Sequence, residues 1–162
     1  MADRIGIELS PFACRVVELP ALRMGRPRVD AGPPSFTLLP RSGPATTAHL
    51  ASLRGRRASI IIWGLHGDYR QVVVGRGSYD RIRREARAAA RSAGVAVHGT
   101  VSDVSPAGTL DEDTGRRVVL LSTAPAGEVT AALRPIRDAG IKIHSVRPPA
   151  SALLSQIGRA HV

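Results

Sequence analysis

The sequence is poor in the side chains that carry disulfide, thiol and base-stacking chemistry. Its 162 residues include a single cysteine, Cys14, so no disulfide can form within the chain and a reducing, cytoplasmic compartment is indicated. Cys14 lies beside an apolar run, where a small buried thiol is expected rather than a reactive one. Phe, Trp and Tyr make up only 3% of residues, which leaves few platforms for stacking the bases of single-stranded nucleic acid.

Long apolar segments and metal-binding patterns are also missing. No run approaches the roughly 18 apolar residues of a transmembrane helix, and the first ten residues lack the basic start and apolar core of a signal peptide. The five histidines show no i,i+4 pairing and have no cysteine partners, so no zinc site is predicted. With 43% hydrophobic residues, the chain is expected to be a globular cytoplasmic protein.

Positive charge is abundant. There are 23 Lys and Arg residues against 13 Asp and Glu, a formal net charge of +10. A positive net charge of this size favours binding to nucleic acid or to an anionic membrane surface. The arginines are spread along the chain, however, and together with the many alanines and glycines they fit a GC-rich coding sequence. Direct binding of nucleic acid is therefore not expected.

The N-terminal stretch, residues 5–19, predicts a β-hairpin. Ile5, Ile7 and Leu9 alternate with Gly6 and Glu8, which is the pattern of a half-buried strand. The dipeptide at 10–11 breaks this run as a turn, and an apolar run resumes at residues 15–19.

Three further elements are predicted before residue 68. Residues 36–39 lie between prolines and predict an edge strand. Residues 45–53 predict a short helix with Thr46 or Thr47 as N-cap and Gly55 as the stop. Residues 58–63, ASIIIW, predict a strand of a parallel sheet that is buried on both faces.

The next segment predicts the order β-α-β-β-α-β, which is the ferredoxin-like arrangement. Its expected elements are strand 69–74, helix 78–93, strand 95–104, loop 105–115, strand 116–122, helix 127–139 and strand 141–146. In the loop, clustered carboxylates are interpreted as a solvated turn, because their spacing is not that of an EF-hand. The first helix carries five arginines around an alanine-rich stripe, which leaves open a solvated helix or an anion-facing surface. Before it, Ser78 is expected to be the N-cap.

The N-terminal stretch resembles the opening of the PilM family, actin-like cytoplasmic proteins of type IV pilus assembly. Glu8 stands where that family has an Asp, residues 10–13 match its Gly/Ser-rich turn, Arg15 matches its Lys, and residues 17–19 match its Val-Glu-Leu ending. The resemblance implies an α/β fold: a partial actin-like, ribonuclease H-like domain with an inserted ferredoxin-like subdomain. It divides the chain into an actin-like part at 1–67, the insertion at 68–146 and a return to the actin-like domain at 147–156. Residues 157–162, IGRAHV, look like the translation of a sequencing adapter, so a truncated reading frame is expected.

The resemblance implies a Mg–ATP site in which Glu8, Ser10 and Arg15 would contact the nucleotide. Actin-like ATPases use an acidic residue for the magnesium shell and backbone N–H groups of the turn for the phosphates. Here Pro11 has no N–H to donate and Phe12 brings bulk to the turn. Catalytic activity in this stretch of chain is therefore not expected.

The resemblance also implies a partner, the cytoplasmic N-terminal tail of a bitopic membrane protein of the PilN type. Its groove is expected to involve Trp63, Leu65, Asp68 and Val146. The protein would then act as a scaffold at the cytoplasmic face of the inner membrane, in a type IV pilus or type II secretion platform, and self-association is compatible with this role. Two alternatives stay open: part of a sugar-kinase or chaperone-type ATPase, and a basic ferredoxin-like module that binds RNA.

Overall fold

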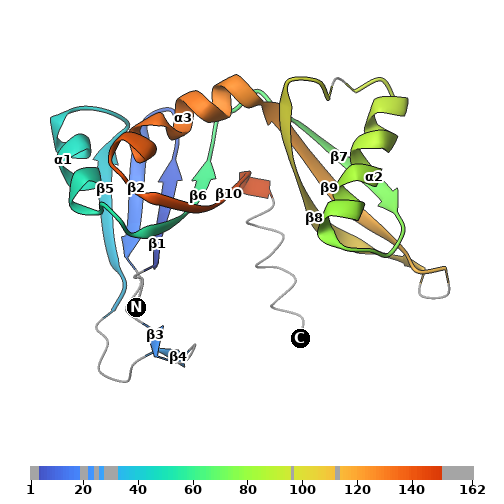
Figure 1. Ribbon diagram of the computed structural model, residues 1–162, viewed down its shortest axis with the longest axis horizontal. Helices are drawn as coiled ribbons and strands as arrows, with labels where there is room; N and C mark the ends of the chain where they lie inside the picture. The colour runs from blue at the N-terminus through green and yellow to red at the C-terminus, as the bar shows by residue number, and fades with distance from the viewer. Residues whose placement is uncertain are drawn as a thin grey trace. The chain divides into compact units, whose positions relative to one another are not determined.

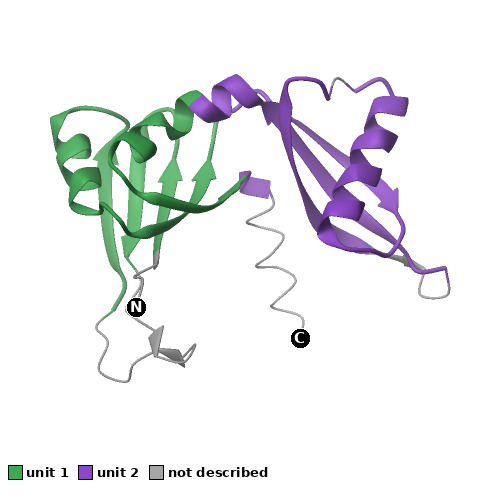
Figure 2. Ribbon diagram, viewed as in Figure 1, with its two compact units in different colours: residues 1–64, 131–147 green, residues 65–130, 148–162 purple. Residues whose placement is uncertain are grey.

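The computed structural model describes residues 4–18, 22–23, 26–27, 33–95, 97–111 and 114–150. The chain forms two compact units (Figure 2). The first unit comprises residues 1–64 and 131–147, and the inserted unit comprises residues 65–130 together with the described residues 148–150. A separate short ribbon pairs β3 (Leu22–Arg23) with β4 (Arg26–Pro27).

The first unit is built on a five-stranded sheet with the order β10-β6-β1-β2-β5 (Figure 1). The predicted hairpin is confirmed, because β1 and β2 pair antiparallel with Ile7 opposite Val16 and Glu8 opposite Arg15. The predicted edge strand is also confirmed, since β5 pairs with β2 and, among the described residues, with no other strand. The strands are β1 Arg4–Leu9, β2 Ala13–Glu18, β5 Ser35–Pro40, β6 Arg57–Ile62 and β10 Lys142–Arg147.

Strand β6 lies between β1 and β10 and runs parallel to both, as its apolar run predicted. The prediction that it is buried on both faces is wrong. Ala58, Ile60 and Ile62 are buried, whereas Ser59 is exposed and Ile61 is only half-buried. On the side of the sheet where Ala58, Ile60 and Ile62 are buried, the unit also buries apolar residues of helices α1 (Pro44–Ser52) and α3 (Ala126–Asp138).

Helix α1 begins earlier than predicted. Its N-cap is Gly43 with Pro44 in the first turn, rather than Thr46 or Thr47. Proline suits the first turn because its missing N–H would have no helical partner there. The two threonines lie inside the helix, where their hydroxyls donate to the carbonyl oxygens of Pro40 and Gly43 at 2.8 and 3.0 Å.

Strand β10 corrects the predicted ferredoxin-like insertion at 68–146. Instead of joining the inserted sheet, β10 pairs parallel with β6, with Val146 opposite Ile60 and a register shift between Ile143 and Ser145. The second half of α3 also belongs to the first unit. The six elements follow the predicted order, but the last strand belongs to the five-stranded sheet of the first unit.

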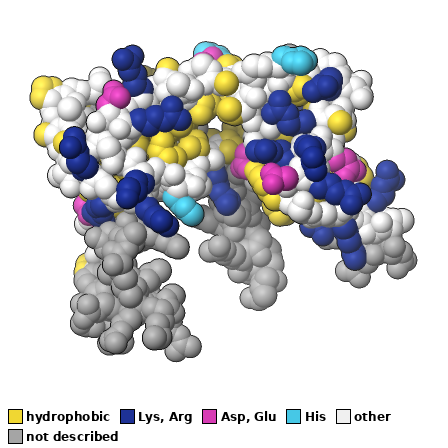
Figure 3. All heavy atoms as spheres, viewed as in Figure 1, with side chains coloured by type: hydrophobic (Ala, Val, Ile, Leu, Met, Phe, Trp, Pro, Cys, Tyr) yellow, Lys and Arg dark blue, Asp and Glu magenta, His cyan; other side chains and the backbone are white. Residues whose placement is uncertain are grey.

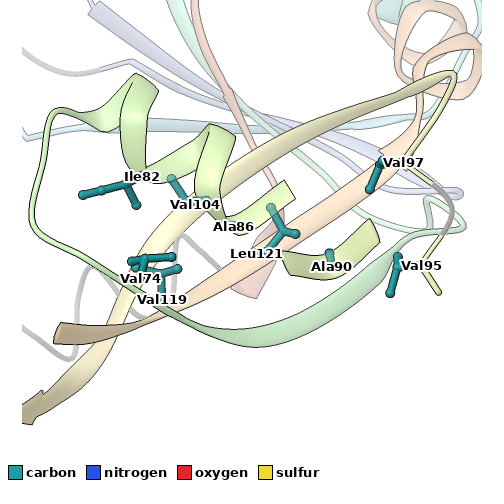
Figure 4. Packing of buried hydrophobic residues seen from close by; sticks show 9 residues of the cluster. All are labelled: Val74, Ile82, Ala86, Ala90, Val95, Val97, Val104, Val119 and Leu121. Atoms are coloured by element: carbon teal, nitrogen blue, oxygen red, sulfur yellow. The ribbon is translucent and has the colours of Figure 1, made fainter. Parts of the chain in front are cut away.

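The inserted unit is a three-stranded antiparallel sheet, ordered β7-β9-β8, with α2 packed on it. Strand β8 starts at Thr100 rather than at residue 95 and continues through most of the predicted loop. Val95 and Val97 are nevertheless buried, in the connection after α2, and they close the core shown in Figure 4. The elements are β7 Asp68–Val74, α2 Tyr79–Ser92, β8 Thr100–Asp111 and β9 Arg116–Pro125.

Among the described residues, no helix is both long and apolar enough to cross a membrane.

Candidate functional site

The turn between β1 and β2 lies where β1 ends, at the carboxyl edge of the parallel strands. The N–H of Trp63 donates to the carbonyl oxygen of Leu9 at 2.8 Å, so the ends of β6 and β1 lie side by side there. In open α/β sheets this edge is the usual place for a ligand. Among the described residues it is therefore the natural candidate for a nucleotide site in this fold.

The hydroxyl of Ser10 closes this turn on itself. Its oxygen accepts hydrogen bonds from the backbone N–H groups of Ala13 and Phe12, at 2.9 and 3.3 Å. The same hydroxyl lies 3.1 Å from the carbonyl oxygen of Ala13, to which it donates, and that carbonyl also accepts the N–H of Ser10 at 2.9 Å. The N–H groups that would hold a phosphate in such a turn are thus already engaged by the turn itself.

The two remaining turn residues also disfavour a phosphate. Pro11 has no N–H, and its ring packs against Gly64 so closely that a Cβ on Gly64 would lie 2.7 Å from the Pro11 Cγ. Gly64 also has a φ of +75°, which a side chain would strain. The Phe12 side chain is 87% exposed. The turn therefore does not fit a phosphate group: it offers apolar surface where an ATPase offers N–H donors.

Glu8 and Arg15 are brought together across the hairpin. Their register pairs them, and Arg15 Nη1 lies 3.2 Å from Glu8 Oε1. The carboxylate that the resemblance assigns to the magnesium shell is thus occupied by the cation assigned to the phosphates. Both side chains are partly exposed, so this is a surface ion pair worth little stability.

The four residues predicted for a partner groove belong to two units. In the first unit, Trp63 directly follows β6 and is 43% exposed. Val146 is half-buried on β10 and faces the same side of the sheet as its register partner Ile60, whereas strand alternation places Trp63 on the opposite side. Within the first unit, the structure therefore does not bring Trp63 and Val146 to one face. Leu65 is half-buried and Asp68 is exposed at the start of β7, both in the inserted unit.

One polar contact of the inserted unit was not foreseen from the sequence. The carboxylate of Glu128, in the first turn of α3, accepts the backbone N–H of His66 at 3.0 Å and lies 3.0 Å from its Nδ1. The hydrogen bond from the His66 N–H holds the pKa of Glu128 below its usual value. Both residues lie within two positions of the points where the chain passes between units. Sequence patterns carry no signal for a contact spanning 62 positions.

The arrangement of the first unit defines a class of fold. A parallel pair next to an antiparallel hairpin and edge strand, interrupted by an inserted unit, is a partial actin-like α/β domain. No family model and no curated protein sequence matches the chain.

The solved structures that share this fold include the two that follow. One is a PilM-PilN type IV pilus biogenesis complex, with a TM-score of 0.64 and 18% identity, covering 97% of this chain and 50% of that one. The other is the cytoplasmic domain of EpsL, an inner-membrane component of the type II secretion system of Vibrio cholerae. It has a TM-score of 0.57 and 12% identity, covering 91% of this chain and 57% of that one. The chain thus spans about half the length of each of these structures.

Proposed function

We propose that this chain belongs to a cytoplasmic scaffold of a type IV pilus or type II secretion assembly platform. In this proposal it binds the cytoplasmic N-terminal tail of a PilN-type bitopic membrane protein. The observation that supports it is the fold similarity over 97% of the chain to a structure of a PilM-PilN complex. The similarity to the EpsL cytoplasmic domain points to the same kind of inner-membrane machinery.

Of the residues predicted for the groove, Trp63 is the best suited to an experimental test. A side chain of this size, 43% exposed at the end of a central strand, supplies apolar area that a partner can cover. Tryptophan is enriched among the residues that dominate binding energy at protein interfaces. It is also the single tryptophan of the chain, so its fluorescence reports on this position alone.

We further propose that the turn at residues 10–12 binds no nucleotide, so the scaffold works without ATP at this position. The engaged N–H groups, Pro11 and the Glu8–Arg15 ion pair support this proposal. They also disfavour the sugar-kinase and chaperone-type ATPase alternative, which requires an intact phosphate turn. We expect Mg–ATP to leave the melting temperature unchanged, because a ligand that does not bind the folded state cannot stabilise it. A concentration-dependent rise with Mg–ATP would overturn this part of the proposal.

The test of the scaffold function is a titration of a fluorescently labelled synthetic tail peptide with the full chain, followed by anisotropy. We expect saturable binding that weakens at least about tenfold in Trp63→Ala, which is the loss of a modest interface anchor. The matched control is Phe36→Ala, which also removes an exposed aromatic ring of the first unit, 77% exposed on edge strand β5. Equal weakening in both variants, or no saturable binding to the unmodified chain, would contradict the proposal.

A further inference from the structure

Helix α2 of the inserted unit concentrates positive charge, and only part of it is engaged within the fold. It carries five arginines and two acidic residues in 14 positions. Figure 3 shows Lys and Arg side chains over both units, several of them over the unit that contains this helix. The question is which of these charges hold the structure together and which are available to a partner.

Two of the arginines and both acids have structural partners. Arg87 donates to the Val97 carbonyl oxygen and to the Ser102 hydroxyl, each at 2.8 Å, and so ties α2 to the connection before β8 and to β8 itself. Arg83 lies 3.6 Å from Asp80. The second acid, Glu85, accepts the N–H of Gly75 at 3.0 Å.

The other three arginines, at positions 81, 84 and 91, are exposed. Within the described residues, no hydrogen bond or ion pair engages their guanidinium groups. Among the described residues, neither acid of the helix forms an ion pair with any of the three. These three side chains are called the arginine row below.

The arginine row follows one ridge of the helix. Successive residues of an α-helix turn by about 100°, which places positions 81, 84, 88 and 91 within one outer sector. The buried residues of the helix, Ile82, Ala86 and Ala90, lie opposite. The row extends for about 15 Å at 1.5 Å per residue, and exposed Ala88 between its members adds no bulk.

We propose that the arginine row binds an anionic lipid surface, bringing the inserted unit against the membrane. A straight line of cations without bulky side chains between them suits a flat layer of phosphate headgroups. Binding would be electrostatic and reversible, because the outer sector holds no large apolar residue that could insert. An aromatic platform for bases is missing from this sector as well, which disfavours single-stranded nucleic acid.

This inference rests on the proposed function, which puts the chain at the cytoplasmic face of the inner membrane. The two can fail separately. Binding of the chain to lipid vesicles that contain no partner protein tests the arginine row alone. The titration with the tail peptide is done in solution without lipid, so it tests the scaffold function alone.

The experiment is cosedimentation of the full chain with vesicles of phosphatidylglycerol and phosphatidylethanolamine, compared with vesicles of phosphatidylcholine alone. The test variant is R81Q/R84Q/R91Q, in which glutamine keeps a helix propensity close to that of arginine. The control variant, R54Q/R57Q/R137Q, removes the same charge from exposed arginines of the first unit. Circular dichroism checks that both variants are folded.

We expect the unmodified chain to sediment with the anionic vesicles only. Three surface cations contribute on the order of a hundredfold to such binding at low salt, so the test variant should lose at least about tenfold and the control within about twofold. Raising the ionic strength should weaken binding, because the Debye length falls from about 30 Å at 0.01 M to about 8 Å at 0.15 M.

Three results would overturn the proposal. One is the absence of binding to anionic vesicles, or equal binding to neutral ones. The second is an equal loss in both variants, which would show that net charge rather than the row is responsible. The third is binding of a labelled DNA duplex that requires the arginine row when vesicle binding does not, which would assign the row to nucleic acid.

Discussion

Neighbouring isoleucines of β6 provide a stringent test of the sheet in the first unit. Ile60 is 1% exposed and lies between Ile7 of β1 and Val146 of β10. Ile61, the next residue, is half-buried and lies between the polar side chains of Glu8 and Arg147. The two substitutions to alanine remove the same atoms from the same strand, so they differ only in the face that they affect.

Ile60→Ala should lower the free energy of unfolding by about 3 to 4 kcal/mol, because fully buried isoleucines lose both transfer energy and packing when truncated. Ile61→Ala should cost about 1 to 1.5 kcal/mol, since part of its side chain is already in water and strand propensity supplies part of the loss. We therefore expect the two variants to differ by about 2 kcal/mol.

Equilibrium unfolding in urea, followed by Trp63 fluorescence, measures this difference. Trp63 directly follows β6, so its emission reports on the first unit even if the two units unfold separately. With a slope of roughly 2 kcal/mol per M, the midpoints of the two variants should lie about 1 M apart. Equal losses would refute the description, because they would mean that β6 is buried on both faces.

Three further predictions concern the inserted unit and can be measured by circular dichroism or absorbance. Gly67→Ala should destabilise by about 1 to 3 kcal/mol, because a Cβ there would lie 2.3 Å from a carbonyl oxygen of β9, whereas Gly127→Ala has open space and should be neutral or slightly stabilising. Arg87→Met should cost about 2 to 4 kcal/mol through the loss of its hydrogen bonds to Val97 and to Ser102 of β8, and the same change at exposed Arg84 should stay within about 0.5 kcal/mol. Partial burial and a hydrogen bond to the carboxylate of Asp103 in β8 raise the pKa of Tyr79 to about 12. The stability that the protonated Tyr79 hydroxyl contributes is therefore complete below pH 10 and is lost as the pH rises toward 12. Equal melting temperatures for the two glycine variants, equal costs for the two arginine variants, or a phenol absorbance titration in which Tyr79 ionises near pH 10 would contradict these predictions.

Local patterns were sufficient for the elements that neighbours in sequence determine. The alternation at residues 5–9 and the break at Ser10 specify the hairpin, and prolines at both ends of β5 mark it as an edge strand. The ASIIIW run identified a strand in parallel pairing, because β-branched residues without a turn signal suit a central position. These expectations depend on the chemistry of a few consecutive residues.

Partner choice over long distances could not be predicted in this way. The β-α-β-β-α-β order is the same whether β10 joins the inserted sheet or returns to β6, so the periodicity of residues 141–146 does not identify its neighbour. Val95 and Val97 gave the signal of a strand because they are buried, although the structure buries them in a connection. Burial and strand pairing produce the same local pattern.

In the candidate site, too, some features could be predicted from the sequence and others could not. The absence of an N–H at Pro11 could be read directly from the sequence. The closure of the turn by the Ser10 hydroxyl could not, because Ser10 also matched the phosphate-binding turn of the family. Nor could the sequence show that Glu8 and Arg15 pair with each other rather than with a ligand.

The most direct test of the scaffold function is the emission spectrum of Trp63 during titration of the unmodified chain with the tail peptide of a PilN-type protein. Binding near Trp63 should shift its emission to shorter wavelength and saturate at one peptide per chain, because a side chain that is 43% exposed loses contact with water. An unchanged spectrum at peptide concentrations well above the dissociation constants of specific protein complexes would contradict the account.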